Sequence, residues 1–183
     1  MNRRTFLTFL AAAPLGACQH RGLVVLPDEP SAAYTLAGGD RLRVIVFGQD
    51  NLSNIYAVDG SGRIAMPLIG TVPAAGMTTT QLERSIEGRL RTGYIREPKV
   101  TVEVDGYRPF FILGEVTNSG QFPFVNGMTV QTAVAIAGGY TPRAARDYAE
   151  VTRITQRGPM TVAVPINQRL RPGDTVVVKE RWF

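Results

Sequence analysis

The chain has almost none of the residues from which catalytic and metal centres are most often built. Its 183 residues include one cysteine, Cys18, and one histidine, His20. A Ser-His-Asp or Cys-His arrangement needs a histidine beside its nucleophile, and a zinc site needs several cysteine or histidine ligands. The sequence also lacks a P-loop and a Gly-x-Gly-x-x-Gly motif after a strand. We therefore predict no metal site, no cofactor and no enzymatic activity.

Two further absences narrow the class of protein. After Cys18 no apolar stretch approaches the roughly 20 residues that a membrane-spanning helix needs, so we expect that the protein does not itself cross a membrane. The formal net charge is +5, and its many arginines are scattered instead of forming a basic tract. Such a charge does not predict nucleic-acid binding. With 44% hydrophobic residues the chain can still bury a core, and its length allows one or two small domains.

The N-terminus has the pattern of an export signal. Arg3-Arg4 precedes a short apolar run over residues 5–13, and Leu15-Gly16-Ala17-Cys18 follows. These last four residues resemble the lipobox of bacterial lipoproteins, so we predict that residues 1–17 are cleaved and that Cys18 is acylated. A signal peptide with an incidental buried cysteine and a cytosolic amphipathic N-terminus are the alternatives. The paired arginines fit both the twin-arginine and the general export route, and the absence of aspartate after Cys18 favours the outer membrane.

Residues 18–33 are predicted to be a tether. Pro27 and Pro30 stiffen this stretch, which has no clear period. Asp28 and Glu29 form a pair of adjacent carboxylates. Because they lie in a tether bounded by prolines, we expect them to be solvated and not catalytic.

The first part of the body reads as strands around one helix. Residues 41–47 alternate as a strand, and strands over 55–58 and 63–66 flank a hairpin-like turn at Asp59-Gly60-Ser61-Gly62. A helix is expected over 78–91 because Leu82, Ile86 and Leu90 form one apolar stripe. Thr80 and Glu83 fit a capping box, Gly93 is a natural stop, and a strand follows over 99–104.

A second unit of the same kind is predicted to begin near residues 105–109. We expect a strand over 110–116, a turn at Asn118-Ser119-Gly120, and a short helix that Thr129 caps and Gly138-Gly139 ends. Further strands are expected over 148–155, 161–164 and 175–179. Each unit thus combines short strands with a single helix, which is an α+β plan.

The ordered turn motifs of the two units resemble two known domains. The first, residues 34–105, is similar to the polysaccharide export domain through Tyr34-x-Leu36, Gly39-Asp40-x-Leu42, Gly62-x-Ile64 and Pro67-x-Ile69-Gly70. The second, residues 106–183, is similar to the soluble-ligand-binding β-grasp (SLBB) domain. Its motifs are Gly114-Glu115-Val116, Gly138-Gly139 and Pro172-Gly173-Asp174.

The resemblance implies an outer-membrane polysaccharide export lipoprotein, held by its lipid at the periplasmic face. Members of this family form homo-oligomeric rings through which polysaccharide passes, and they work with an inner-membrane polysaccharide co-polymerase. Longer members add a further β-grasp domain and a C-terminal amphipathic helix, whereas this chain ends at Phe183. The resemblance is thus to the short members, and we expect a separate outer-membrane pore protein.

The candidate site residues are Cys18 for lipid attachment and the turn residues of the two domains. We expect the turn residues to set backbone geometry more than to touch sugar, with Asp40 and Asp174 bonding nearby backbone N–H groups. The turn residues are Gly39, Asp40, Gly62, Pro67, Gly70, Gly114, Glu115, Gly138, Gly139, Pro172, Gly173 and Asp174.

Several roles stay open at the level of sequence. Four arginines, Arg41, Arg43, Arg63 and Arg108, fit either the lining of a lumen or pairing across subunits. Trp182 and Phe183 fit an interface anchor or the edge of a core. For the whole protein, a monomeric lipid-anchored glycan- or ligand-binding module is the alternative to a ring. An enzyme acting on polysaccharide would need paired carboxylates, and the sequence nominates no such pair.

Overall fold

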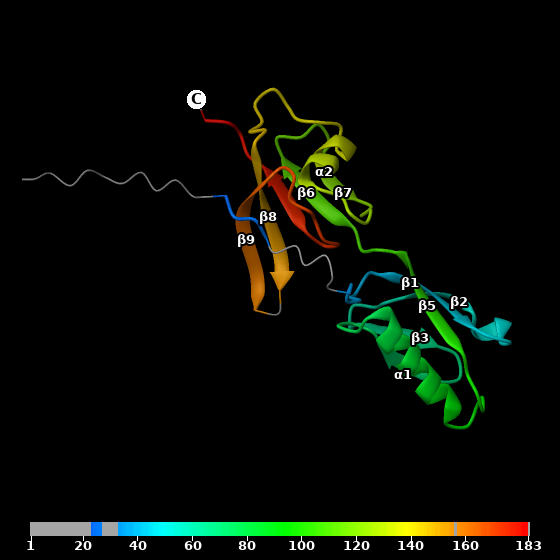
Figure 1. Ribbon diagram of the computed structural model, residues 1–183. Coiled ribbons are helices and arrows are strands. Elements are labelled where there is room, and N and C mark those ends of the chain that lie inside the picture. The colour runs from blue at the N-terminus through cyan, green and yellow to red at the C-terminus, as the bar shows by residue number, and fades with distance from the viewer. Residues whose placement is uncertain (1–22, 27–32, 156, 183) are drawn as a thin grey trace, which may run out of the picture.

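The computed structural model describes residues 23–26, 33–155 and 157–182. Two α+β units follow each other along the chain and lie end to end (Figure 1). They are joined by a short connector, residues 107–109, between strands β5 and β6. The predicted α+β class is confirmed. The signal peptide and Cys18 lie outside the described residues.

The first unit is built on a three-stranded antiparallel sheet of order β2-β1-β5. β1 spans Arg41–Val46, β2 Asn54–Ala57 and β5 Val100–Gly106, and a short 3-10 helix, η1 (Asp50–Leu52), links β1 to β2. β1 alternates as predicted, with Leu42, Val44 and Val46 buried. These side chains share one core with Leu82, Ile86 and Leu90 of helix α1 (Thr79–Arg91).

The predicted hairpin at 59–62 is wrong in its pairing. The turn itself is tight, because the Asp59 N–H donates to the carbonyl of Arg63 at 2.8 Å. However, the strands on either side diverge: β2 pairs with β1, whereas β3 (Arg63–Met66) pairs with β4 (Gly70–Pro73) in a separate two-stranded sheet. A local turn motif does not determine which strands the two flanking segments pair with.

The capping box of α1 also lies elsewhere than predicted. Thr78 is the N-cap: its hydroxyl accepts from the Gln81 N–H at 3.2 Å, and the Gln81 side chain accepts from the Thr78 N–H at 2.9 Å. Glu83 instead accepts from the Val102 N–H at 2.9 Å, and Glu87 accepts from the Val100 N–H at 3.1 Å. The helix carboxylates thus satisfy donors along the edge of β5 that would otherwise need another partner.

The second unit is a five-stranded mixed sheet of order β7-β6-β10-β8-β9. β6 (Phe110–Gly114) and β10 (Thr175–Val178) are parallel, and the other neighbours are antiparallel. The remaining strands are β7 (Gly120–Phe122), β8 (Tyr148–Thr155) and β9 (Gly158–Pro165). β7 lies partly where only a turn was expected, and β6 ends two residues earlier than predicted.

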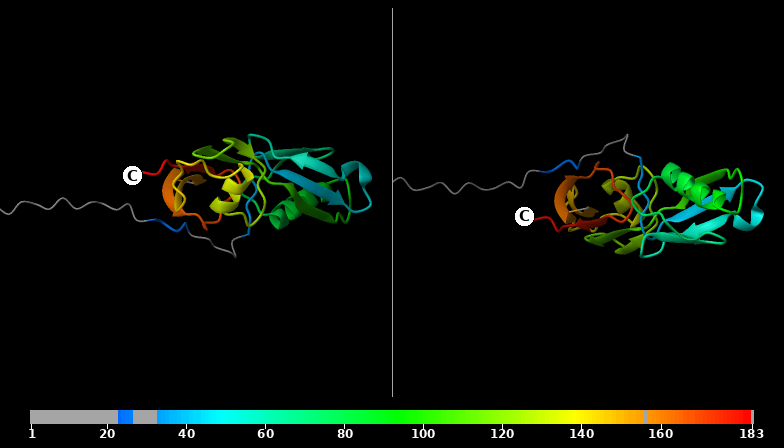
Figure 2. Two further views of the ribbon diagram at one scale, coloured as in Figure 1. Left: turned by 90° about the horizontal axis from the view of Figure 1, so that it is seen from above. Right: turned by 90° about the horizontal axis from the view of Figure 1, so that it is seen from below.

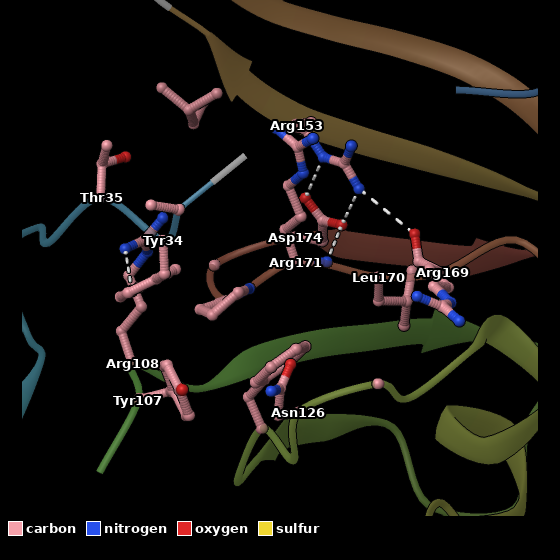
Figure 3. Close-up of a pocket in the computed structure, with 16 residues that line it drawn as sticks. Tyr34, Thr35, Tyr107, Arg108, Asn126, Arg153, Arg169, Leu170, Arg171 and Asp174 are labelled. Atoms are coloured by element: carbon pink, nitrogen blue, oxygen red, sulfur yellow. Dashed lines mark hydrogen bonds and ion pairs between the residues drawn. The ribbon is translucent and has the colours of Figure 1, made fainter. Parts of the chain in front are cut away.

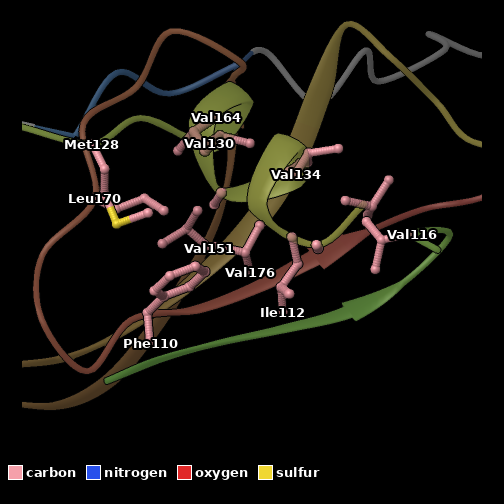
Figure 4. Close-up of a cluster of buried hydrophobic side chains, with 14 of the residues drawn as sticks. Phe110, Ile112, Val116, Met128, Val130, Val134, Val151, Val164, Leu170 and Val176 are labelled. Carbon is pink, nitrogen blue, oxygen red and sulfur yellow. The ribbon is translucent and has the colours of Figure 1, made fainter. Parts of the chain in front are cut away.

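Helix α2 (Val130–Ile136) covers one face of this second sheet (Figure 4). Thr129 is its N-cap, as predicted, and its hydroxyl accepts from the Thr132 N–H at 3.3 Å. Val130, Ala133 and Val134 are buried against side chains of β6, β8 and β10. A seven-residue helix is too short to be stable alone, so this packing is what holds it.

Part of the predicted tether packs against the second unit. The Val24 N–H donates to the carbonyl of Ala163 in β9 at 2.8 Å, and Leu26 is buried in the second core. Gln168 holds Leu26 at both backbone groups: its Oε1 accepts from the Leu26 N–H at 3.0 Å and its Nε2 donates to the Leu26 carbonyl at 3.3 Å. Residues 23–26 therefore pack against the second unit, although they precede the first unit in the sequence (Figure 1).

Candidate functional site

The most developed concave feature of the described residues is a cleft of about 550 Å³ where the two units meet. Its lining comes from the start of the first unit, the connector, the loop before α2, the end of β8 and the turn before β10 (Figure 3). Two Gly-Asp turns lie beside it, Gly39-Asp40 from the first unit and Gly173-Asp174 from the second. Arg108 of the connector lies between them.

The first of these turns holds the connector. Asp40 is fully buried, and its carboxylate accepts from the Ala37 N–H at 2.9 Å, the Tyr34 hydroxyl at 2.6 Å and the Arg108 N–H at 2.9 Å. The Arg108 guanidinium donates to the Tyr34 oxygen at 2.9 Å and lies 3.7 Å from the Asp40 carboxylate. Burial, and next the hydrogen bond to Asp40, raises the pKa of Tyr34 far above its usual value. Tyr34 therefore stays a neutral donor.

The second turn holds an arginine of the sheet. Asp174 is 1% exposed and accepts from Arg153 twice, from Nε at 2.9 Å and from a terminal nitrogen at 2.7 Å. It also accepts from the Arg171 N–H at 2.7 Å. The two parallel bonds form the bidentate geometry that best joins a guanidinium to a carboxylate. Arg153 is thus held in a buried ion pair at the wall of the cleft (Figure 3).

Both predicted aspartates bond nearby backbone N–H groups, and the structure adds that the two turns share a neighbour. A Cβ atom at Gly39 would lie 3.3 Å from Arg108 Cβ, and one at Gly173 would lie 2.7 Å from Arg108 Nε. Both glycines have positive φ, +92° and +84°. Arg108 can lie between the two turns because both positions lack a side chain.

The other predicted turn residues lie away from the cleft. Gly62 is the end of the Asp59 turn, Pro67 lies in the loop from β3 to β4, and Gly70 is the first residue of β4. Glu115, after Gly114, accepts from the Thr141 hydroxyl and lies 3.4 Å from an Arg143 nitrogen. Gly138 and Gly139 end α2, and their carbonyls accept from the Thr117 hydroxyl. Sequence reasoning grouped all these residues by motif, whereas the structure brings only the Gly39-Asp40 and Pro172–Asp174 turns together.

The four arginines whose role the sequence left open lie in different parts of the structure. Arg41 and Arg43 lie 3.6 and 3.0 Å from Asp105 on the first sheet, and Arg63 donates to the Thr71 hydroxyl at 3.4 Å. Only Arg108 of that group lines the cleft. Sequence reasoning missed Arg153, Arg169 and Arg171, which line it as well. Arg169 and Arg171 come just before the predicted Pro172-Gly173-Asp174 turn, and that nearness in the sequence was the signal that could have found these two.

The described residues contain neither a metal-binding cluster nor a helix that could span a membrane. No group of three or more His, Cys, Asp or Glu side chains in the described part of the chain is placed to hold a metal ion. None of the helices in the described segments has the length and apolar character to cross a membrane. Trp182 is 93% exposed, so it is not the edge of a core within this chain.

The chain matches two known families in the order in which its units occur. Residues 28–105 match the family described as polysaccharide biosynthesis/export protein, and residues 109–164 match the SLBB domain. It is 33% identical over 126 residues to the exopolysaccharide production protein ExoF of Rhizobium meliloti (strain 1021), covering 65% of this chain and 29% of that protein. It is 26% identical over 111 residues to the polysialic acid transport protein KpsD of Escherichia coli, covering 60% of this chain and 20% of that protein.

The chain thus spans less than a third of the length of either curated relative. None of these names is that of an enzyme. The two matched domains, in that order, account for both units described above. The chain therefore contains a polysaccharide biosynthesis/export domain followed by an SLBB domain.

Proposed function

We propose that the protein is a component of a polysaccharide export machine at the periplasmic face of the outer membrane. A lipid on Cys18 holds it there, and copies of it form a homo-oligomeric ring that guides the polymer. An inner-membrane polysaccharide co-polymerase delivers the polymer, and a separate outer-membrane pore protein releases it. The domain pair supports this role, as do relatives whose names state exopolysaccharide production and polysialic acid transport.

The observation that carries the proposal is the packing of residues 23–26 against the second unit, through Val24 on β9 and Leu26 in the core. Leu23 is only five residues after Cys18, which at full extension is at most ~18 Å of chain. A lipid on Cys18 therefore places the second unit next to the membrane. The first unit lies at the opposite end of the long axis, as the two views in Figure 2 agree. With the second unit at the membrane, we expect the first unit to extend into the periplasm. This orientation leaves the first unit accessible to a partner in the inner membrane.

Apolar side chains are exposed at the end that would face the lipid. Leu23, Val24 and Val25 are 49%, 47% and 70% exposed, and Trp182 is 93% exposed. Trp182 is the last residue that the structure describes, and this part of the chain lies at the same end of the molecule as residues 23–26 (Figure 2). Tryptophan favours the boundary between lipid and water, because its ring is apolar and its N–H is polar. These side chains fit a membrane surface beside the acyl group.

An exposed apolar face on the first sheet supports contact between copies. Ile45 and Ile55 project from neighbouring strands of that face, and Phe47 follows at the end of β1 with 80% of its surface exposed. A ring needs a heterologous contact, in which this face meets a different surface of the next copy and the rotation closes. Large apolar side chains exposed on one face of a sheet are typical of interaction surfaces.

The membrane orientation can be tested with the one tryptophan of the chain. In vesicles that contain brominated lipids, the fluorescence of Trp182 in the lipidated protein should be strongly quenched. A matched protein with Trp182→Phe and Phe47→Trp carries its probe on the far unit and should show little quenching. Cys18→Ser should abolish lipidation and release the protein from membranes. Equal quenching of the two probes, or an unmodified Cys18 in the membrane fraction, would overturn the proposal.

The ring is tested by native mass spectrometry in mild detergent, with and without the co-polymerase. We expect a discrete high-order species, and Phe47→Ser should shift it to the monomer without unfolding it. A protein that stays monomeric in both conditions favours the alternative function, a lipid-anchored glycan-binding module. The cleft between the units is the observation that would carry that alternative.

A further inference from the structure

We propose that the cleft between the two units binds acidic sugar residues of the polymer, through their carboxylates. This rests on the proposed function in one respect only, that the ligand is a polysaccharide. It goes further in naming the site on the chain and the charge of the sugar that the site takes.

The charges around the cleft are unequal. Arg108, Arg153, Arg169 and Arg171 line it, and Asp174 is the only acidic residue among the described lining residues. Asp174 is already matched by the two bonds from Arg153, and the Asp40 carboxylate, which is not part of the lining, lies 3.7 Å from the Arg108 guanidinium. Arg169 and Arg171 also make further contacts within the molecule, so what they contribute to the argument is charge and position. An arginine-rich wall favours a carboxylate, because the planar guanidinium donates to both of its oxygens.

Two of the arginines are held in place before any ligand arrives. Arg153 is fastened by Asp174, and Arg108 is fastened by Tyr34 and by the turn that contains Asp40. Because these side chains are already ordered, a ligand that uses them loses less side-chain freedom on binding. The buried aspartates thus serve the cleft by fixing the positions of its cations.

The remaining lining is suited to a sugar ring. Tyr34 and Tyr107 are partly exposed and meet edge to face, with ring centroids 5.0 Å apart, and Phe124 continues the row at 5.6 Å from Tyr107. Aromatic faces pack against the apolar face of a sugar, and the amide of Asn126 can bond its hydroxyls. A cavity of about 550 Å³ also lies within the size range of small-molecule sites. The cleft therefore combines an apolar wall with a cationic one.

The test compares an acidic and a neutral trisaccharide on the full lipidated protein in detergent. Isothermal titration with trigalacturonate should show binding that weakens as salt is raised, because exposed charges are screened. Maltotriose, which has similar size and no carboxylates, should bind much more weakly. Arg169→Gln with Arg171→Gln should weaken trigalacturonate binding about tenfold. The matched control, Arg84→Gln with Arg91→Gln, removes two exposed arginines from α1, outside the cleft, and should leave it unchanged.

Three outcomes would overturn the proposal: no trigalacturonate binding at millimolar concentration, equal binding of the two sugars, or equal losses in the cleft and control variants. Its failure is separable from failure of the proposed function. A lipidated ring that binds neither sugar contradicts the cleft alone, whereas a monomer that binds trigalacturonate contradicts the ring alone. Circular dichroism of each variant shows whether the fold is kept.

Discussion

The same four-residue turn occurs once in each unit, at Ala37–Asp40 and at Arg171–Asp174. In both, the aspartate N–H donates to the carbonyl three residues earlier, at 3.2 and 3.1 Å. In both, the carboxylate accepts from the N–H of that earlier residue, at 2.9 and 2.7 Å. Both aspartates are buried and each is followed at once by a strand, β1 or β10. The turn is a local structure that the sequence repeats.

The two turns differ in what their carboxylates hold. Asp174, just before β10, binds Arg153 of β8. Because β8 and β10 are neighbours in one sheet, this bond stabilises a single unit. Asp40 binds the backbone and lies near the guanidinium of Arg108, so it fastens the first unit to the connector. A turn motif thus determines where an acceptor lies, and the tertiary structure determines which donor it meets.

Asp174→Ala should be the most destabilising change. It leaves the Arg153 side chain, 10% exposed, without its carboxylate, and breaking a buried ion pair costs about 3–5 kcal/mol. Urea denaturation followed by circular dichroism measures the loss, and Asp174→Asn separates the loss of charge from the loss of shape. A cost below about 1 kcal/mol would show that water reaches and solvates Arg153.

Asp40→Ala should cost less, about 2–3 kcal/mol, because its partners are mostly neutral donors left without an acceptor. The difference between the turns should appear in hydrogen exchange. The amide of Arg108 should exchange faster in Asp40→Ala and stay protected in Asp174→Ala. If both variants expose that amide equally, the two turns act as one structure and our distinction between them is wrong.

Alanine in place of the turn glycines should sharpen the comparison. Gly39→Ala and Gly173→Ala each place a side chain at positive φ, at about 1–2 kcal/mol. The new Cβ at position 173 also meets Arg108 Nε, whereas the one at position 39 meets Arg108 Cβ. Arg108→Ala keeps Cβ and removes Nε, so it should relieve Gly173→Ala but not Gly39→Ala. A double-mutant cycle on unfolding free energy measures this, and equal coupling at both positions would contradict it.

Tyr34→Phe should have the smallest effect at neutral pH, about 1 kcal/mol for the lost hydrogen bonds. The substitution should also change how the unfolding free energy depends on pH. The folded pKa of Tyr34 is raised by burial, so the stabilisation is present below about pH 10 and falls as the unfolded tyrosine ionises above it. The wild type should therefore lose stability more steeply than Tyr34→Phe in alkali. Tyr56 and Tyr140 also have raised pKa values but are present in both proteins. Parallel curves above pH 10 would show that Tyr34 ionises freely.

Local patterns predicted much of the fold. The β1 alternation, the α1 stripe, the Thr129 cap and the strand at Tyr148–Thr155 all appear as expected, because each depends on neighbours a few residues apart. The errors occur where a choice depends on distant partners. Glu83 looked like a helix cap and instead bonds β5, and the turn at Asp59 looked like a hairpin whose arms in fact join different sheets.

The candidate site divides in the same way. The sequence alone determined that Asp40 and Asp174 follow glycine in turns and accept backbone N–H groups, since those bonds span three residues. Only the tertiary structure decided that both turns meet at Arg108, that Arg153 faces Asp174, and that Leu26 is held by Gln168 from 142 residues away. Contacts at such separation follow from how whole sheets pack, and no short stretch of residues contains that information.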